Sequence, residues 1–370
     1  DKNKRLITPN KKFKEKIFIL GVLSGGLGGR LWPVSREGHP KPFIKLLDGK
    51  TLLEKTYNRI KNIPNILKVD EKPFVLTVTN KEYYFLCKEE LNNANLSGIF
   101  LLEPEGRNTA PAITIAAHWV KHFYGEDASM LIFPADHLIE ETSKFLSCIK
   151  KMQSIVLDST PSIVTFGIPP KSADTGFGYL QIGAQISKGF KVKKFVEKPN
   201  ISKAQYFLKS KDFFWNSGIL GFRVNILFEE LKDYAYEIYD STKHVFQEVL
   251  KVNKSQNKVI YLPDEPFKKC NDLSIDFSLL EKSKKLVLIP STFDWNDIGS
   301  WLNYSYLVRP DKDNNKKIGN AIFLKSQNTF INSQDRLVAA IGLRDIMIID
   351  TDDALLVISS SHSQDVKQLR

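Results

Sequence analysis

Apolar runs rich in β-branched residues alternate with longer segments of helical period through the first half of the chain. The runs that predict strands are 17–23, 74–79, 99–102, 130–133 and 162–166. The segments that predict helices are 51–62, one that starts near 81, 109–123 and 142–157. Such alternation is typical of βαβ units. It predicts an α/β fold with a Rossmann-like, mostly parallel sheet that helices cover on both faces.

The pattern changes beyond residue 167, where glycines and prolines separate shorter apolar runs at 179–182 and 192–196. Insertions of this kind usually form the walls of a ligand site at the carboxyl edge of such a sheet. Four more apolar runs follow a polar connector at 310–317, and they are 321–324, 337–341, 346–349 and 354–358. Their spacing of ~8 to 16 residues predicts a small all-β domain of stacked, left-handed β-helix-like coils.

Three parts of the chain are therefore expected. They are a flexible basic tail at 1–16, a main α/β domain at 17–309 and a small all-β domain at 310–370. The last part is too short to be stable by itself, so we expect it to pack on the main domain or on another subunit.

The composition, with 42% hydrophobic and 26% charged residues over 370 positions, is typical of a soluble globular protein. No apolar run approaches the ~20 residues that a membrane-spanning helix needs. The three cysteines, Cys87, Cys148 and Cys270, are widely spaced and form no Cys-x-x-Cys pair. Scattered cysteines predict reduced, buried thiols in a cytoplasmic protein rather than disulfides or a zinc site.

Nearly half of the formal net charge of +11 lies at one end of the chain. Residues 1–16 carry seven Lys or Arg side chains and two acidic ones, a net charge of +5. A tail of this kind is usually solvated. The remaining basic residues are not interleaved with aromatic ones, so we expect no nucleic-acid-binding groove. Small anionic molecules are the more suitable partners.

A glycine-rich turn with two cations follows the first predicted strand. Its residues are Gly25, Gly26, Gly28, Gly29, Arg30 and, further on, Lys41. Glycines leave backbone N–H groups uncovered for an anion, and the cations would neutralise that anion. The turn therefore predicts a phosphate site, with an ordinary strand-to-helix turn as the alternative.

Two well-known phosphate loops do not fit this turn. A dinucleotide fingerprint that starts at Gly26 would need its third glycine where the chain has Leu31. A P-loop that ends at 49–51 would need its first glycine where the chain has Ile44. The turn must belong to another class of phosphate-binding protein.

Two carboxylates could hold a divalent cation. Asp136 follows the predicted strand 130–133, and ligands of open α/β sheets bind at the carboxyl ends of the strands. Asp297 lies between Trp295 and Trp301, which suggests a walled, partly dry site. Mg²⁺ that bridges to substrate phosphates needs only one or two protein carboxylates. The alternative is that both aspartates cap helices.

Polar residues at two later strand ends suit a phosphorylated, hydroxylated ligand. Glu197 would accept hydrogen bonds from hydroxyls while the adjacent Lys198 faces a phosphate. Asn216 could bond sugar hydroxyls with both its donor and its acceptor. A solvated strand end is the alternative for the first pair.

Taken together, these segments resemble the mannose-1-phosphate guanylyltransferases of the sugar-nucleotidyltransferase superfamily. The segments similar to that family's motifs are 30–33, 40–43, 107–112, 133–137, 197–199, 215–218 and 294–301. The C-terminal runs resemble the short β-helix segment of the family's single-function form. We expect this form because the chain has no room for the isomerase domain of the bifunctional form.

The resemblance implies a Mg²⁺-dependent enzyme that makes GDP-mannose and pyrophosphate from GTP and mannose 1-phosphate. The small all-β domain at 310–370 favours a homodimer. Its nucleotide site would comprise Leu23, Ser24, Gly25, Gly26, Gly28, Gly29, Arg30, Lys41, Arg107, Asn108, Thr109, Ala110, Pro134 and Asp136. Its sugar-phosphate site would comprise Gly178, Glu197, Lys198 and Asn216. Asp136 and Asp297 would bind the metal. Catalysis would depend on Arg30, Lys41 and Lys198.

Some features stay open at this stage. The family's opening usually reads Gly-x-Gly-Thr-Arg, whereas this chain has Gly29 in place of the threonine and Leu27 in a commonly small, polar position. We therefore expect weaker binding of the nucleotide.

Helix capping is the alternative role for Asn108 or Thr109. Backbone carbonyls or Glu103 could read guanine, and another nucleotide, another hexose phosphate or a non-catalytic regulatory role are alternatives for the function.

Overall fold

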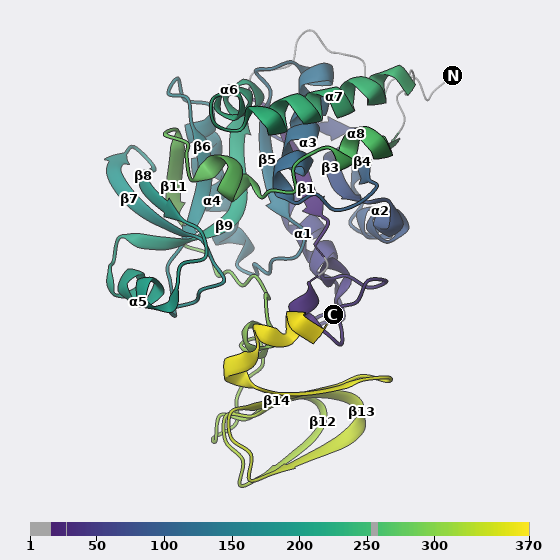
Figure 1. Cartoon of the computed structure of the whole chain (residues 1–370), viewed down its shortest axis with the longest axis vertical. Coiled ribbons are helices and arrows are strands. Elements are labelled where there is room, and N and C mark those ends of the chain that lie inside the picture. The colour runs from purple at the N-terminus through teal and green to yellow at the C-terminus, as the bar shows by residue number, and fades with distance from the viewer. Residues whose placement is uncertain (1–15, 27, 253–257, 370) are drawn as a thin grey trace. The chain divides into compact units, whose positions relative to one another are not determined.

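The computed structural model describes residues 16–26, 28–252 and 258–369, and the chain forms two compact units (Figure 1). The first unit contains the residues up to Gly25 together with Leu53–Ala135 and Ile139–Trp295. The second contains Gly26–Leu52, Asp136–Leu138 and the chain from Asn296 onward. Each unit thus combines segments that are distant in sequence, and the linear boundary near 310 stays a prediction.

Two sequence-based expectations lie outside the described residues. The basic tail is outside except for Lys16, and so is Leu27 of the glycine-rich turn. The expected flexibility of the tail and the expected effect of Leu27 on nucleotide binding therefore stay predictions.

A parallel block of strands forms one half of the large sheet in the first unit. Strand β1 (Phe18–Ser24) lies between β3 (Lys72–Asn80) and β5 (Ser129–Pro134) and is parallel to both. Strands β4 (Ser97–Glu103) and β10 (Val259–Tyr261) extend the block in the same direction. The carboxyl ends of β1, β3, β4 and β5 therefore share one edge, where such sheets bind ligands.

The other half of this sheet is mixed, with mostly antiparallel pairs of strands and a parallel pair. The central strand, β9 (Phe213–Arg223), is antiparallel to β5 and to β6 (Ile163–Ile168). Beyond β6 follow β11 (Leu286–Pro290), which is parallel to β6, and the hairpin of β7 (Tyr179–Ile186) and β8 (Gly189–Val196). A two-residue strand, β2 (Lys68–Val69), adds to β3. The expected α/β class is confirmed, and the alternating pattern predicted its parallel half.

The first four helices of the first unit agree with the predicted segments to within a few residues, whereas the four from α5 onward were not predicted. They are α1 (Leu52–Ile60), α2 (Tyr84–Asn93), α3 (Thr109–Tyr124), α4 (Thr142–Val156), α5 (Ile201–Lys209), α6 (Val224–Tyr234), α7 (Tyr236–Val252) and α8 (Asp264–Lys268). Helix α3 is almost wholly buried because α7 packs on it, as His118 and Phe246 illustrate with stacked rings. Burial lowers the pKa of His118 to about 4, so this histidine is a neutral core residue.

The described part of the second unit includes a four-stranded sheet, the helix α9 (Trp301–Ser305) and several short 3₁₀ helices. Strands β12 (Lys316–Leu324), β13 (Phe330–Ile341) and β14 (Ile346–Asp350) are parallel, and β15 (Leu355–Ser359) is antiparallel to β14. Each of the four expected apolar runs overlaps one of these strands. This agrees with the predicted small all-β domain. One apolar cluster joins some of the buried residues of these strands to Trp301 of helix α9, namely Phe330, Met347, Ile349 and Leu356. A second cluster contains Ala321, Ile331, Ala340 and Ile348.

Two expectations about the whole chain can be checked directly. Cys87, Cys148 and Cys270 are free and buried, as their spacing predicted. Among the described residues, no helix is both long and apolar enough to cross a bilayer.

Candidate functional site

Lys41 is held against the glycine-rich turn in the second unit. It begins the short 3₁₀ helix Lys41–Phe43, and its side chain is only 8% exposed. Gly28 has a φ of 66°, and a Cβ at this position would lie 2.3 Å from the Cβ of Lys41. Only glycine fits both the left-handed backbone and the close approach. The bare backbone at Gly28 therefore leaves room for the Lys41 side chain to lie against the turn.

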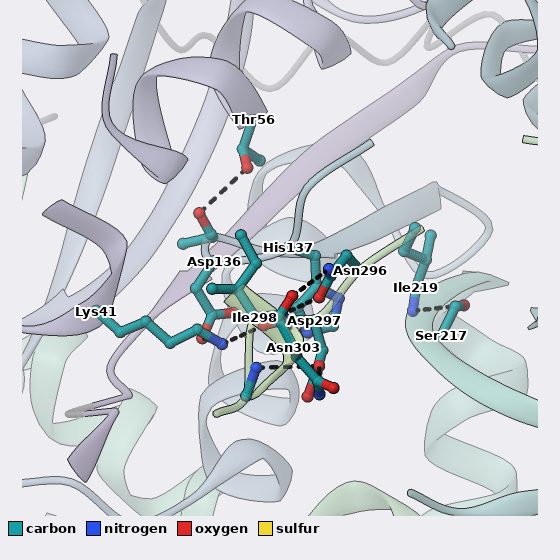
Figure 2. A network of polar contacts seen from close by, with 12 residues as sticks. Lys41, Thr56, Asp136, His137, Ser217, Ile219, Asn296, Asp297, Ile298 and Asn303 are labelled. Carbon is teal, nitrogen blue, oxygen red and sulfur yellow. Dashed lines mark hydrogen bonds and ion pairs between the residues drawn. The ribbon is translucent and has the colours of Figure 1, made fainter. Parts of the chain in front are cut away.

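The Lys41 ammonium joins the two aspartates that the sequence singled out (Figure 2). Its Nζ lies 2.9 Å from Oδ2 of Asp136 and donates a hydrogen bond to the backbone oxygen of Asp297. Burial by itself would raise the pKa of Asp136, but Lys41, with His137, lowers it below the usual value of an aspartate. Asp136 is therefore an ionised carboxylate beside a nearly buried cation.

The carboxylate of Asp297 is held in place by its own segment. Its Oδ1 accepts hydrogen bonds from the Gly299 N–H at 3.0 Å and from Nδ2 of Asn303 at 3.1 Å. The cap of helix α9 is Ser300, whose Oγ accepts a hydrogen bond from the N–H of Asn303. Helix capping as the role of Asp297 is therefore wrong.

Helix capping is wrong for Asp136 as well. Helix α4 has Glu141 at its N-cap position, and the N–H groups of Glu141 and of the preceding Glu140 both donate to the carboxylate of Asp294. Sequence reasoning missed this role of Asp294, because the acceptor comes from a segment more than 150 residues away. Asp136 is left to interact with Lys41.

The donor set around Lys41 suits a hard cation that substrate oxygens help to coordinate. Within the described parts of the chain, no group of three or more His, Cys, Asp or Glu side chains is arranged to hold a metal ion. Asp136 and Asp297 therefore stay the expected oxygen ligands of a divalent cation. Mg²⁺ typically binds one or two carboxylates and takes its other ligands from water and phosphate.

Arg30 has a partner that the sequence did not predict. Its Nη1 donates a hydrogen bond of 2.6 Å to Oε1 of Gln364, which lies 334 positions later in the chain. Gly29 and Arg30 belong to one short 3₁₀ helix, Gly29–Leu31. Binding a phosphate through this guanidinium would require it to share or leave the Gln364 contact.

A buried carboxyl group lies beside the turn at the end of β1 in the first unit. Gly25 follows the buried Ser24, and a Cβ on Gly25 would lie 3.5 Å from Oε2 of Glu103. Glu103 is 4% exposed, and its Oε1 has no hydrogen-bond partner in the described structure. Burial raises the pKa of Glu103 to about 8, so this carboxyl group is mostly protonated at neutral pH. Leu23 and Pro134 pair at the same edge of the sheet.

The segment 107–110 is tied to the start of α3. Arg107 forms an ion pair with Glu105, and Asn108 caps the helix by accepting a hydrogen bond from the N–H of Thr109. Oγ1 of Thr109 accepts a hydrogen bond from the N–H of Ile275. Ala110 is fully buried. The capping role proposed for Asn108 is thus confirmed.

The four residues expected to bind the sugar phosphate lie together in the first unit. Nζ of Lys198 lies 2.9 Å from Oε1 of Glu197, and the lysine side chain is 62% exposed. A Cβ on Gly178 would lie 2.5 Å from Oε2 of Glu197, so a larger residue at position 178 would displace this carboxylate. The N–H of Asn216 donates to the carbonyl oxygen of Gly178 at 2.9 Å.

The amide of Asn216 already has several partners. Its Oδ1 accepts hydrogen bonds from Oγ1 of Thr165 and from the N–H of Gly218, and its Nδ2 donates to Asp276. The second N–H of the Asn216 amide remains for a ligand, whereas the amide oxygen is already bonded. The expectation that Asn216 offers both a donor and an acceptor is therefore reduced to the donor. Sequence reasoning missed Thr165 and Asp276, because neither lies in a recognisable motif.

Two family models match successive parts of the chain. Residues 21–313 match the family model described as nucleotidyl transferase. Residues 319–369 match the model described as MannoseP isomerase/GMP-like beta-helix domain.

Comparisons with individual proteins identify named relatives. The chain is 38% identical over 361 residues to mannose-1-phosphate guanylyltransferase 2 of Escherichia coli O157:H7, which covers 95% of this chain and 72% of the relative. It is 36% identical over 354 residues to mannose-1-phosphate guanylyltransferase of Klebsiella pneumoniae, with coverage of 94% and 72%. A crystal structure described as mannose-1-phosphate geranyltransferase from Thermus thermophilus has the same fold, with a TM-score of 0.78, 24% identity and coverage of 96% and 98%.

Proposed function

The chain belongs to the mannose-1-phosphate guanylyltransferases of the nucleotidyltransferase family, and on that premise we propose that it makes GDP-mannose from GTP and α-D-mannose 1-phosphate. The resemblance seen in the sequence motifs is confirmed by these relatives. The single observation that carries the proposal is the contact of Lys41 with Asp136 and Asp297. This group combines a cation for phosphate with the Asp136 carboxylate and with the backbone of Asp297, the second proposed metal ligand.

The proposed reaction needs no general base. A phosphate oxygen of mannose 1-phosphate forms a bond to the α-phosphorus of GTP. The bond from that phosphorus to the bridging oxygen of the β-phosphate breaks, and pyrophosphate leaves with the bonding electrons. The attacking oxygen is already anionic, so catalysis consists of aligning two anions and stabilising charge on the transferring phosphorus.

Lys41 and the aspartates would serve this charge stabilisation. Asp136 and Asp297 would hold a Mg²⁺ ion, which neutralises phosphate oxygens when it is bound. The Lys41 ammonium is 8% exposed, and a cation in such a poorly solvated place attracts a phosphate more strongly than a surface lysine does. Gly28 would keep this ammonium beside the turn whose N–H groups face the phosphates.

The sugar phosphate is proposed to bind at the group around Glu197. Lys198 would pair with its phosphate, and the exposed position of this side chain suits a ligand that arrives from solvent. Glu197 would accept hydrogen bonds from hydroxyl groups, and the second N–H of Asn216 would donate to a hydroxyl oxygen. Together these groups offer a cation, an acceptor and a donor to one hexose phosphate.

Glu103 is proposed to read guanine. The N1–H and 2-amino groups of this base need acceptors, and Oε1 of Glu103 has no partner among the described residues. A buried acceptor left unpaired by the wrong base would lower the affinity for that base. The closeness of Gly25 to Glu103 supports a base site beside the phosphate turn.

A homodimer is proposed through the β-strands of the second unit. These strands expose several large apolar side chains, each more than half exposed: Ile322, Leu324, Leu337, Ile341, Leu355 and Val357. Exposed apolar patches of this kind commonly mark protein interfaces. Three free, buried cysteines support the proposal that the enzyme works in the cytoplasm.

The proposed function is tested by pyrophosphate release from GTP and mannose 1-phosphate with and without Mg²⁺. Turnover that depends on both substrates and on the metal supports it. Binding of GDP-mannose without any turnover would instead indicate a regulatory protein. Turnover with another nucleotide or hexose phosphate instead would assign a different substrate specificity within the family.

A further inference from the structure

The segment before β11 brings an aspartate to the proposed sugar site. Asp276 begins a π-helical turn, Asp276–Leu280, and lies partly buried. Such turns insert one residue into a helix, which redirects the neighbouring side chains, and they occur frequently at functional sites. Here Oδ1 of Asp276 accepts a hydrogen bond of 2.8 Å from Nδ2 of Asn216, 60 positions earlier.

This contact decides which way the Asn216 amide points. Oγ1 of Thr165 donates to Oδ1 of Asn216 at 3.0 Å, and the N–H of Gly218 donates to the same oxygen at 3.3 Å. The amide oxygen is thus surrounded by donors and the amide nitrogen faces an acceptor. Oγ1 of Thr165 also lies 2.9 Å from the carbonyl oxygen of Ile219 and can accept as well as donate, so the Gly218 N–H and the Asp276 carboxylate set the direction of the amide. A rotation by 180° would set the amide nitrogen against that N–H and the amide oxygen against that carboxylate, so the network favours the orientation with Nδ2 toward Asp276.

The charges around Asp276 belong to the proposed sugar site. Burial and the nearby Glu197 carboxylate raise the pKa of Asp276 to about 7, although Lys198 and the Asn216 hydrogen bond act in the opposite direction. The carboxylate of Glu281 accepts a hydrogen bond from the N–H of Glu197. Asp276 thus interacts with three of the four residues that we assign to the sugar phosphate.

We infer that Asp276 is a positioning residue of the hexose-phosphate subsite, because it fixes the Asn216 amide so that a single N–H remains for the ligand. This inference rests on the proposed function. The subsite then offers one donor, from Asn216, and one acceptor, from Glu197, in a fixed arrangement. Such a pair selects a hexose by the placement of its hydroxyl groups rather than by their number.

The inference predicts a selective effect of the substitution Asp276→Ala. Loss of the acceptor frees the amide, so the KM for mannose 1-phosphate rises about 10-fold, as expected for one lost hydrogen bond to an acidic group. The KM for GTP stays within about two-fold of wild type. Asp276→Asn retains an acceptor oxygen and restores the KM for mannose 1-phosphate to within about two-fold. Asp272→Ala, an exposed acid of the same segment, is the matched control.

A second variant tests the same network from the other side. Thr165→Val removes the hydroxyl that donates to Oδ1 of Asn216 while keeping the shape of the side chain. It should also raise the KM for mannose 1-phosphate and leave the KM for GTP unchanged. Because Thr165 is fully buried, thermal unfolding of each variant is measured beside the kinetics. This second variant keeps the inference testable if Asp276→Ala does not fold.

The outcomes separate this inference from the proposed function. Wild-type protein without turnover of GTP and mannose 1-phosphate contradicts the proposed function. Wild-type turnover with unchanged KM for mannose 1-phosphate in folded Asp276→Ala and Thr165→Val overturns only the role of Asp276. Equal losses for both substrates, not restored by Asp276→Asn, would show a purely structural role and overturn it as well.

Discussion

The ammonium of Lys41 lies 2.9 Å from Oδ2 of Asp136, with the two side chains 8% and 23% exposed. The sequence motifs assign the lysine to a phosphate and the aspartate to a metal ion. The contact means that each group neutralises the other before substrates bind. When substrates bind, the triphosphate would pair with Lys41 and the metal ion with Asp136. Neither charge would then be left unpaired.

Removing Lys41 should strongly slow the reaction. We expect Lys41→Ala to lower kcat/KM by about 10²- to 10³-fold, as when one transition-state donor is lost. Steady-state pyrophosphate release from GTP measures the effect. Lys45→Ala is the matched control, because Lys45 lies in the same segment and is exposed. Near-normal turnover of Lys41→Ala would show that this lysine has no catalytic role.

A methyl group at Gly28 should disturb Lys41 indirectly. Gly28→Ala places a Cβ in the left-handed region and against the lysine side chain, so we expect a loss of stability of about 1–2 kcal/mol. The displaced lysine should also lower kcat/KM. Thermal unfolding and pyrophosphate release measure the two effects. Gly38→Ala is the control, because a Cβ there has no neighbour within 4 Å. Equal behaviour of the two variants would contradict the prediction.

Glu103 should make the stability depend on pH. Burial raises its pKa from 4.5 to about 8, so the folded protein keeps a proton that the unfolded chain releases. The stability that this group contributes is complete below pH 4.5 and is lost as the pH rises to about 8.

The substitution Glu103→Gln should remove that loss. The variant gains stability over wild type as the pH rises from 5 to 8.5, by about 3 to 5 kcal/mol at most. Thermal unfolding at both pH values checks this, with the exposed Glu89→Gln as control. A difference between variant and wild type that does not change with pH would show that Glu103 titrates normally.

Lys198 should affect the sugar phosphate more than the nucleotide. Its ammonium pairs with Glu197 and is 62% exposed, so its removal should leave the fold intact. We expect Lys198→Ala to lower kcat about 10²- to 10³-fold and to raise the KM for mannose 1-phosphate. Initial rates with each substrate varied in turn measure this, and the exposed Lys194→Ala is the control. An unchanged KM for mannose 1-phosphate would count against the assignment.

Local patterns were sufficient to predict much of this molecule. The first strand and the glycines after it follow from residue type alone, since an apolar run and a bare backbone need no distant partner. The same is true of Asn108, which caps the helix that starts at the next residue. The parallel half of the sheet follows from alternating strands and helices.

Distant contacts could not be predicted in this way. The direction of β9 depends on which strands it joins, and its apolar residues look the same in either direction. Gln364 meets Arg30 across 334 positions, and Asp276 meets Asn216 across 60. No short motif marks either partner, so only the folded chain reveals them. The capping alternatives for Asp136 and Asp297 were plausible for the same reason.

The most direct test of the account is pyrophosphate release measured with Mg²⁺ for GTP, ATP and UTP against mannose, glucose and fucose 1-phosphates. The account predicts that GTP with mannose 1-phosphate gives the highest kcat/KM, by about 10-fold or more over every other pair. It also predicts that Lys41→Ala abolishes most of that rate. Equal or higher kcat/KM with another pair, or no turnover with any, would contradict the central claim.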